Sequence, residues 1–379
     1  MRIGINGRFL LQPFTGIGQV TKNLFRELSA MDPKNEYVFI VPEDLPAKLK
    51  REFGKNVKFK VLHERNLLKP GMKKTWWEQV SLIEYFENEG KDGEKFDWVI
   101  YPYPSNPWPK DFYKKGPKVA VMVHDCIPWK NKEYTKGVLS KIYHFQSKRA
   151  VKNADLVLTV SETSKKDIVK YCGVKRNEVK VIYNDVSPSY KNATKGADKI
   201  LKKYGLKKGE FFLYCGGYDE RKNVEQLIEE YETFKENSKS DMPLVLAGGK
   251  LFESSLYSSF DDEIEGLVKT GFLSESELAN LYSTCCGFIH ISKEEGFNIP
   301  LLEAANCEAP LILSQIPVHK EIAGNAAIFV KNKDGEAAKA MRKVCGKRVR
   351  DGLVKKSREL AKKYSWKESA KKLKNMLSS

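Results

Sequence analysis

The chain lacks the cysteine number of a disulfide framework and the cysteine spacing of a zinc site. Its 379 residues contain 7 cysteines, an odd number, and no C-x-x-C pair. This pattern argues against both a disulfide scaffold and a structural zinc site. We therefore expect the protein to work in a reducing, cytoplasmic compartment.

Long apolar runs are also missing. No stretch approaches the roughly 20 apolar residues that a transmembrane helix requires, and Met1–Asn6 is too short for a signal peptide and is typical of a strand. The sequence shows no low-complexity segment and no short-period repeat. Its 41% of hydrophobic residues can form sizeable cores, and its length fits about two domains of roughly 150 residues.

Positive charge is in excess and unevenly distributed. The formal net charge is +17. Residues 1–190 carry 34 lysines and arginines against 22 acidic residues, whereas the remainder carries 32 against 27. The first half therefore either meets an anionic partner (a phosphorylated substrate, a membrane surface or a nucleic acid) or carries lysines for solubility.

The sequence contains two successive series of apolar strands that alternate with amphipathic helical segments. This pattern indicates two doubly wound parallel sheets. The first series includes helical segments at Gly18–Met31 and Gly137–Asn153. The expected strands are Ile3–Asn6, Val38–Val41, Trp98–Tyr101, Lys118–His124, Leu156–Val160 and Val179–Tyr183, then Phe211–Cys215, Leu244–Ala247, Val268–Gly271, Gly287–Ile291, Pro310–Leu313 and Ala327–Val330.

The junction between the two series is expected within Ser187–Gly209, where apolar content falls and Lys, Gly, Asn and Pro accumulate. We accordingly expect domains over 1–187 and 188–360, followed by a basic helical segment over 361–379. Two such domains that face each other would leave a cleft at the carboxyl ends of both sheets, where open α/β folds bind ligands.

The segment Glu295–Ala304, EGFNIPLLEA, follows an expected strand and opens an expected helix. Pro300 suits the first helical position, and Gly296 would allow a tight turn that points the amides of Phe297, Asn298 and Ile299 at an anion. Glu295 in the loop and Glu303 one turn into the helix are placed to hold sugar hydroxyls. The alternative is an ordinary strand–loop–helix with solvated glutamates.

A second segment, Gly216–Asn223, reads GGYDERKN after the strand Phe211–Cys215. Its glycines let the chain approach a ligand, and Arg221 and Lys222 supply fixed positive charge. Such cations stabilise the negative charge that develops on a departing diphosphate. The alternative is a surface Arg–Lys pair at a helix start.

These two segments resemble the E-x7-E and G-x-x-x-x-R-K-N motifs of the retaining GT-B glycosyltransferases of the "group 1" family, glycosyltransferase family 4. The resemblance implies a GT-B fold, with an acceptor-binding first domain, a donor-binding second domain and a last helix that returns to the first. It also implies a nucleotide-sugar co-substrate with no further cofactor. The chain contains no D-x-D motif, so we expect no metal.

Further matches follow the same order along the whole chain. Phe14–Gln19, with Gly16 and Gly18, resembles the family's glycine loop, although a plain tight turn is an alternative. His124, followed by Asp125, matches the H-D dyad, whose histidine would hydrogen-bond the transferred sugar while the aspartate orients it or the strand end.

Three other matches have structural readings. Ser161–Ser164 resembles the family's V-S-x-x-S helix start and is equally an N-cap. Glu321 matches a downstream P-E-x-x-G pattern, for which we expect a structural role, and Tyr364–Trp366 resembles the F-S-W before the last helix.

Some positions depart from the family pattern. Gly217 stands where many members carry a phosphate-binding arginine, Asn298 replaces the usual glycine of E-G-F-G, and Asp185 replaces the glycine of I-x-N-G. Trp76–Gln79 together with His124–Pro128 looks most like the O-antigen mannosyltransferase branch. This resemblance implies GDP-mannose as donor, with UDP- or TDP-sugars as alternatives.

We therefore predict a retaining, metal-independent hexosyltransferase of cell-surface polysaccharide synthesis that acts on a glycan or polyprenyl-linked acceptor. The predicted catalytic residues are Glu295, His124, Arg221 and Lys222. The predicted donor-binding residues are Gly16, Gly18, Gly217, Arg221, Lys222, Gly296, Phe297, Asn298, Ile299 and Glu303. No nucleophile for double displacement stands out, which favours front-face substitution.

Cations and aromatic residues alternate over 67–77 and 108–149, which predicts peripheral attachment to an anionic membrane face. Two enzymes are alternatives: a sugar-nucleotide epimerase and a phosphorylase, although the latter usually needs a longer chain and pyridoxal phosphate. The net charge also leaves a nucleic-acid binder as a remote alternative, without a recognisable motif for it. We expect no nucleic-acid partner.

Overall fold

The computed structural model describes residues 1–65, 70–92, 95–106, 116–131, 137–191, 196–249 and 264–379. The chain divides into two compact units, Met1–Asn184 together with Ser365–Ser379, and Asp185–Tyr364. The junctions expected after residues 187 and 360 lie within a few residues of these divisions. Within the described ranges, no helix is both long and apolar enough for a membrane crossing.

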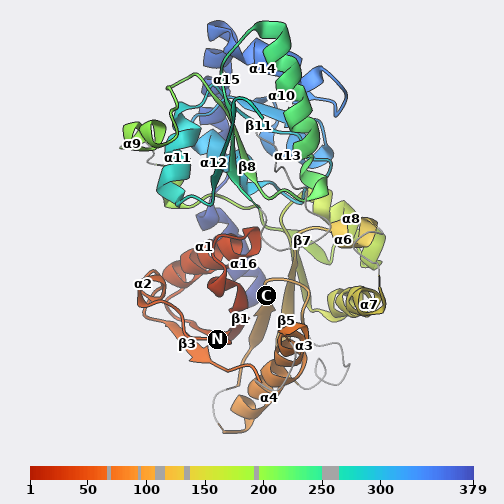
Figure 1. The fold of residues 1–379 in the computed structure, drawn as a ribbon. Helices are drawn as coiled ribbons and strands as arrows, with labels where there is room; N and C mark the ends of the chain where they lie inside the picture. The colour runs from red at the N-terminus through yellow and green to blue at the C-terminus, as the bar shows by residue number, and fades with distance from the viewer. Residues whose placement is uncertain (66–69, 93–94, 107–115, 132–136, 192–195, 250–263) are drawn as a thin grey trace. The chain divides into compact units, whose positions relative to one another are not determined.

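The first unit is built on a seven-stranded, all-parallel sheet in the order β3-β2-β1-β4-β5-β6-β7 (Figure 1). Every strand expected here is present, and each expected strand shares most of its residues with an observed one. The strands are β1 (Arg2–Asn6), β2 (Glu36–Val41), β3 (Val57–Val61), β4 (Trp98–Tyr101), β5 (Lys118–Val123), β6 (Leu156–Thr159) and β7 (Val179–Val181).

Strand β3 was not expected. Its sequence, VKFKV, alternates apolar residues with lysines, so it never forms the continuous apolar run of an inner parallel strand. As the sheet edge it needs only one apolar face, and the ring of Phe59 stacks on Phe39 of β2 with centroids 5.5 Å apart. Lysines on an exposed edge also discourage pairing with another chain.

Helices cover this sheet. Helix α1 is capped by Thr15, whose side chain accepts from the amide of Gly18, and α8 is capped by Ser161, which accepts from the amide of Ser164. The helices are α1 (Gly16–Met31), α2 (Ala47–Lys50), α3 (Pro70–Trp76), α4 (Leu82–Asp92), α6 (Ile127–Lys130), α7 (Val138–Asn153), α8 (Glu162–Cys172) and α16 (Trp366–Ser378), with a 3-10 turn η1 (Arg8–Leu11) and a π-helical turn η2 (Trp77–Ser81).

Helix α16 is far from the rest of the first unit in sequence, yet it packs beside α1. Trp98 of β4 donates from Nε1 to the carbonyl of Leu377 at 2.9 Å, and Lys374 pairs with Asp32 at 3.1 Å. Ser369 donates to the carbonyl of Tyr183 at 2.6 Å. These bonds close the first unit with residues that come after the whole second unit.

The second unit has a six-stranded parallel sheet in the order β10-β9-β8-β11-β12-β13. All six expected strands are present. They are β8 (Phe212–Gly216), β9 (Leu244–Gly248), β10 (Leu267–Gly271), β11 (Gly287–His290), β12 (Leu311–Ser314) and β13 (Ala327–Val330). In the core, Phe212 of β8 meets Phe234 edge-on, with ring centroids 5.2 Å apart.

The helices of this unit include two that matter for the site, α11 and α12. Helix α11 begins with a capping box in which Ser274 and Glu277 each bond the other's amide. The helices are α9 (Ala197–Lys203), α10 (Val224–Ser238), α11 (Glu275–Thr284), α12 (Ile299–Asn306), α13 (Pro317–Ala323), α14 (Glu336–Cys345) and α15 (Lys347–Ala361), with 3-10 turns η4 (Pro188–Tyr190) and η5 (Glu220–Lys222).

Candidate functional site

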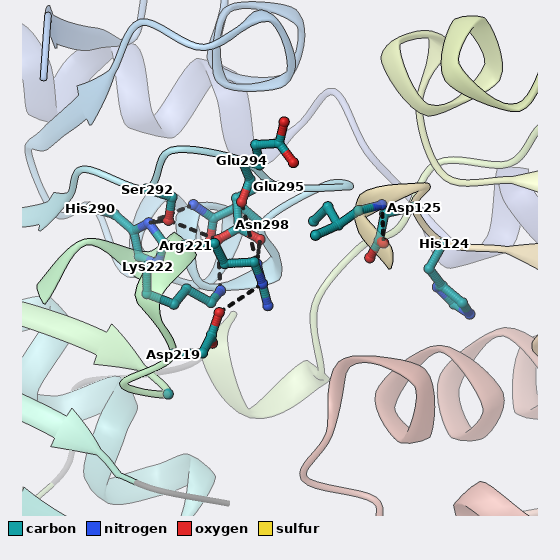
Figure 2. Close-up of polar contacts among 12 residues, drawn as sticks. His124, Asp125, Asp219, Arg221, Lys222, His290, Ser292, Glu294, Glu295 and Asn298 are labelled. Atoms are coloured by element: carbon teal, nitrogen blue, oxygen red, sulfur yellow. Dashed lines mark hydrogen bonds and ion pairs between the residues drawn. The ribbon is translucent and has the colours of Figure 1, made fainter. Parts of the chain in front are cut away.

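Glu295, Arg221 and Lys222 form a buried ion triad in the second unit. Arg221 Nη1 lies 3.0 Å from Glu295 Oε2, and Lys222 Nζ lies 2.6 Å from Glu295 Oε1 (Figure 2). The partners are far apart in sequence but follow β8 and β11, which are adjacent parallel strands. Because parallel strands end at the same sheet edge, the two motifs predicted from sequence meet there.

The charges of the triad are closely balanced. Asp219 Oδ1 lies 2.9 Å from Arg221 Nε, so two carboxylates face two cations. Burial alone would raise the pKa of Glu295, but the charges of Lys222 and Arg221 hold that pKa well below its ordinary value. Glu295 is therefore ionised, and the fixed positive charge predicted for Arg221 and Lys222 is paired with this carboxylate.

The ionised carboxylate keeps one acceptor position. A carboxylate offers about four lone-pair sites, and Glu295 uses three of them, for Arg221, Lys222 and the hydroxyl of Ser292 at 2.8 Å. The ammonium of Lys222 carries three donors, and the described residues supply an acceptor for one. The triad thus retains a site for a hydroxyl donor and sites for an anionic acceptor.

In the turn after Glu295, the residue with the left-handed backbone conformation is not the predicted one. Gly296 does not have a positive φ; Asn298 does, at 71°, and caps α12 from the left-handed region. Helix α12 begins at Ile299, so Pro300 occupies its second position rather than the first. Asparagine is among the few residues apart from glycine that visit this region readily, which explains how it stands where relatives carry glycine.

The Asn298 side chain is held between two buried histidines. It donates from Nδ2 to His319 Nε2 at 2.8 Å and to His290 Nδ1 at 3.2 Å. His319 Nδ1 lies 2.9 Å from the carbonyl of Ser314, which fixes the neutral tautomer that accepts at Nε2. Burial lowers the pKa of both histidines, that of His319 to about 4, so both rings are uncharged at neutral pH.

These histidines were missed from the sequence. Ser292 links them to the triad, because its hydroxyl lies 2.9 Å from His290 Nδ1 and 2.8 Å from Glu295 Oε1. The available signal was the placement of His290 and His319: one ends the strand before the E-x7-E segment, and the other lies two residues before Glu321, which had been noted for a structural role alone.

Glu303 lies on α12, away from the ion triad's charges. It is 6% exposed, and Tyr282 of α11 donates a hydrogen bond to its Oε2 at 3.1 Å. Burial raises the pKa of Glu303 to about 7. The two glutamates of the motif therefore differ in kind: Glu295 is a fixed anion, whereas Glu303 sits near its titration point in neutral solution.

Of the other donor-site candidates in this unit, Gly217 follows β8 and its carbonyl accepts from the hydroxyl of Tyr214 at 2.6 Å. Phe297 is buried, and its ring meets Tyr364 edge-on, with centroids 6.0 Å apart. This aromatic contact anchors the loop through its side chain, whereas the amides of the loop remain the predicted ligand groups.

The remaining candidates belong to the first unit. His124 follows β5 and its Nε2 lies 2.8 Å from the carbonyl of Pro102, so the ring donates there. Burial lowers the pKa of His124. Asp125 accepts from the amide of Ile127, the first residue of the short helix α6, at 3.0 Å. Of the two roles predicted for Asp125, this bond fits the one at the strand end.

Ser164 stabilises the same strand end. Its amide bonds to Ser161 Oγ at 3.0 Å, and its hydroxyl donates to the carbonyl of His124, also at 3.0 Å. The V-S-x-x-S match is therefore an N-cap, as its alternative reading held, and it also ties α8 to the backbone of His124.

The two glycines of the predicted loop have different environments. A methyl group at Gly16 would meet no heavy atom of the described residues within 4 Å. At Gly18 it would lie 2.8 Å from the Gln12 carbonyl carbon and 3.0 Å from the Phe9 carbonyl oxygen, both backbone atoms. Gly18 is therefore required by the fold of this loop, whereas any requirement for Gly16 must come from a ligand.

Groups of three or more His, Cys, Asp or Glu side chains placed to hold a metal ion do not occur within the described ranges.

Solved structures with the same fold define the class. Sucrose-phosphate synthase from Thermosynechococcus elongatus matches with a TM-score of 0.76 and 14% identity over 100% of this chain and 98% of that chain. HepE from Anabaena in complex with UDP and glucose matches with a TM-score of 0.71 and 14% identity, over 100% and 99%. WaaG, a glycosyltransferase involved in lipopolysaccharide biosynthesis, matches with a TM-score of 0.70. The likeness concerns the fold, which is GT-B.

Sequence comparison then gives the family. A model described as "Glycosyltransferase Family 4" matches residues 14–190, and one described as "Glycosyl transferases group 1" matches residues 197–366. Together they cover most of the chain, which therefore belongs to the group 1, family 4 glycosyltransferases.

Two curated relatives narrow the comparison. The O-antigen chain mannosyltransferase RfbU of Salmonella typhimurium is 33% identical over 219 residues, which are 57% of each chain. The serotype-specific mannosyltransferase WbdA of Escherichia coli is 29% identical over 254 residues, 65% of this chain and 29% of that protein. The chain thus spans little more than half of the first relative and less of the second.

Gly16→Ala and Gly18→Ala should separate ligand contact from folding. We expect Gly18→Ala to lower the free energy of unfolding by about 2 kcal/mol or more, because its methyl group meets backbone atoms that cannot rotate away. Gly16→Ala should keep the wild-type melting temperature and lose glycosyl transfer. Equal melting temperatures for the two variants would contradict this account.

Glu303 should make stability fall as the pH rises. Its pKa is raised from 4.5 unfolded to about 7 folded, so its contribution is complete below pH 4.5 and is lost as the pH passes 7. Relative to Glu303→Gln, the wild type should lose roughly 3 kcal/mol of unfolding free energy between pH 4.5 and 8, measured by urea unfolding.

Glu308→Gln, two residues after the end of α12, is the control. Arg358 lowers the pKa of Glu308, so its contribution is lost only as the pH falls below about 4.5. Its difference from the wild type should be flat between pH 5 and 8. Parallel curves for the two variants over that range would show that Glu303 has no raised pKa.

Proposed function

We propose that the protein transfers mannose from GDP-mannose onto a glycan or lipid-linked glycan acceptor, with retention of configuration and without a metal ion. The observation that carries the proposal is the Arg221–Glu295–Lys222 triad at the ends of β8 and β11, beside the Asn298 turn that opens α12. The names of the mannosyltransferase relatives support the sugar. HepE, solved with UDP, keeps UDP-sugars as the alternative donor.

In this proposal the donor diphosphate lies against Lys222, Arg221 and the amides of residues 296–299. These groups are fixed before the reaction, so they stabilise the charge that develops on the diphosphate without reorganising. The remaining acceptor position of Glu295 takes a hydroxyl of the transferred sugar, and Glu303 takes the hydroxyls of the ribose. In the first unit, His124 keeps its place as the predicted contact to the sugar.

The chemical step breaks the bond between C1 of the sugar and the diphosphate oxygen, and a bond from C1 to the acceptor oxygen forms on the face that the diphosphate leaves. The proton of the acceptor hydroxyl passes to the departing phosphate oxygen, so no enzyme nucleophile is needed. Lys222 and Arg221 donate hydrogen bonds to the oxygens of the departing diphosphate, and the amides of residues 296–299 donate to the same group. In this proposal these donors act in place of a divalent cation.

Glu295→Gln tests the proposal. The amide removes the charge that holds Arg221 and Lys222 and should reduce transfer from GDP-mannose on the order of 100-fold or more. GDP should still raise the melting temperature, because the amide's size and the loop amides are retained. Lys293→Ala is the matched control: this lysine lies two residues away, is half-exposed and pairs only with Glu220 among the described residues.

The accompanying measurements distinguish the alternatives. A thermal-shift series with GDP-, UDP-, ADP- and TDP-sugars identifies the donor, and transfer should be unchanged by EDTA. Product formation from donor alone would indicate an epimerase, and steeply salt-dependent binding of DNA or RNA would indicate a nucleic-acid binder. Normal transfer by Glu295→Gln, or loss of transfer in EDTA, would overturn the proposal.

We further propose peripheral attachment to an anionic membrane face. Residues 67–69, 108–115 and 132–136 of the two predicted stretches lie outside the described residues, so the supporting surface is taken from α7. There Lys141 is exposed, Phe145 is 60% exposed, and the Arg149 guanidinium lies 5.6 Å from the centre of its ring. An exposed aromatic ring among cations suits a lipid headgroup surface.

Flotation with liposomes tests this attachment. The wild type should float with anionic vesicles and not with neutral ones, and Phe145→Ala should weaken flotation several-fold because it removes the inserted apolar group. Phe272→Ala, an equally exposed phenylalanine of the second unit, should float like the wild type. Equal and negligible flotation with both vesicle types would reject the attachment.

A further inference from the structure

A polar cluster at the carboxyl ends of β1 and β4 has no part in the function proposed so far. It consists of Arg8, Lys74, Glu78, Gln79 and Tyr103, and we call it the switch-point cluster. In the strand order β3-β2-β1-β4-β5, the chain winds in opposite directions from β1 and from β4. In open α/β sheets, ligands bind at such a reversal of strand order, outside the carboxyl ends of the strands.

The cluster is organised around the π-helical turn η2. Trp77 is fully buried and donates from Nε1 to the carbonyl of Leu62 at 2.5 Å, which fixes the turn in the core. Gln79 donates from Nε2 to the carbonyl of Ser105 at 2.8 Å, which attaches the turn to the segment after β4. A π-turn is rare and frequently marks a functional site, and this one carries Glu78 between its two anchors.

Glu78 is a buried carboxyl group with one oxygen that has no hydrogen-bond partner among the described residues. It is 4% exposed, and within the described ranges no hydrogen bond reaches its Oε1. Burial raises the pKa of Glu78 to about 7, although Lys74 and Arg8 act to lower it. Both cations have other contacts: Arg8 pairs with Glu64, and the Lys74 ammonium lies 4.8 Å from the centre of the Tyr103 ring.

Two further polar atoms are buried beside Glu78 with their hydrogen bonds unmade. Gln79 Oε1 and the hydroxyl of Tyr103 lack partners among the described residues. A buried polar atom without a partner destabilises the fold, and three such atoms lie at one strand-order reversal. Unmade bonds of this kind are expected where a ligand completes them.

The unsatisfied hydrogen-bonding atoms of the cluster indicate which chemical class of ligand it can bind. Glu78 Oε1 and Gln79 Oε1 are acceptors, so the ligand must donate hydrogen bonds, which a phosphate dianion does not. A cationic ligand is disfavoured because Lys74 and Arg8 are both close enough to act on the Glu78 carboxyl. A neutral molecule with neighbouring hydroxyl groups satisfies both conditions, and a sugar ring is such a molecule.

We propose that the switch-point cluster binds the hydroxyl groups of the acceptor sugar, with Glu78 and Gln79 as acceptors and Tyr103 as the third contact. This proposal rests on the glycosyltransferase function proposed above and names the place of its second substrate. In the W-W-E-Q segment, Trp76–Gln79, Trp77 anchors the turn and Glu78 binds the sugar. Gln79 does both, since its Nε2 anchors the turn and its Oε1 accepts from the sugar.

The test uses neutral methyl glycosides with the full-length chain and no donor. Methyl α-mannoside, α-glucoside and α-galactoside at tens of millimolar are examined by saturation-transfer NMR. At least one should bind, and Glu78→Leu and Tyr103→Phe should each weaken that binding about tenfold or more. Glu87→Leu, on the exposed face of α4, is the control and should bind like the wild type.

Melting temperatures with and without GDP distinguish a loss of sugar binding from a loss of folding or of donor binding. Glu78→Leu should melt at or above the wild-type temperature, because an apolar side chain of similar volume replaces an unpartnered buried carboxyl group. If it unfolds instead, Tyr103→Phe decides, since it removes only a hydroxyl. GDP should raise the melting temperature of both variants as it does that of the wild type.

The proposal is overturned if none of the three glycosides binds to the wild type, or if both variants bind them as the wild type does. Failure of GDP to shift the wild type would count against the donor function, whereas loss of sugar binding in the variants would still support the cluster.

Discussion

The second unit depends on a carboxylate that is taken out of water and neutralised by two cations from a neighbouring strand end. Burying Glu295 alone would be prohibitive, and burying Arg221 and Lys222 beside it without their partner would be no better. Each motif therefore requires the other, and the adjacency of β8 and β11 makes the meeting possible. Electrostatic balance is what allows permanent charges at this sheet edge.

Three neighbours of the triad hold its surroundings rigid without adding charge. His290 and His319 are buried, uncharged rings, and each accepts a hydrogen bond from the side chain of Asn298. A charged histidine here would repel Lys222 and would lose the acceptor that holds Asn298. The low pKa of His319 is thus part of the same balance, because a neutral ring lets the turn of α12 lie directly beside the ion triad.

The sequence predicted the parallel strands well because buried parallel strands are continuous apolar runs, and from them it predicted which segments meet at one sheet edge. It missed β3, whose lysines alternate with apolar residues, and His290 and His319, whose role depends on contacts between separate segments. It also assigned the turn to Gly296, since glycine is the usual left-handed residue. The side chain of Asn298 is held by two histidines from separate segments, which no local pattern reveals. The sequence predicted the positive charge of Arg221 and Lys222, but not the ion pairs of these residues with Glu295, which join segments far apart in the chain.

The return of α16 to the first unit has a consequence for biosynthesis. A nascent chain emerges from the ribosome in sequence order. The bond of Trp98 to Leu377 and the ion pair of Asp32 with Lys374 therefore cannot form until the entire second unit has been synthesised. During that interval the surface that α16 will cover remains exposed to chaperones and proteases. The first unit to be translated is therefore the last to be completed, and its maturation is tied to that of the second.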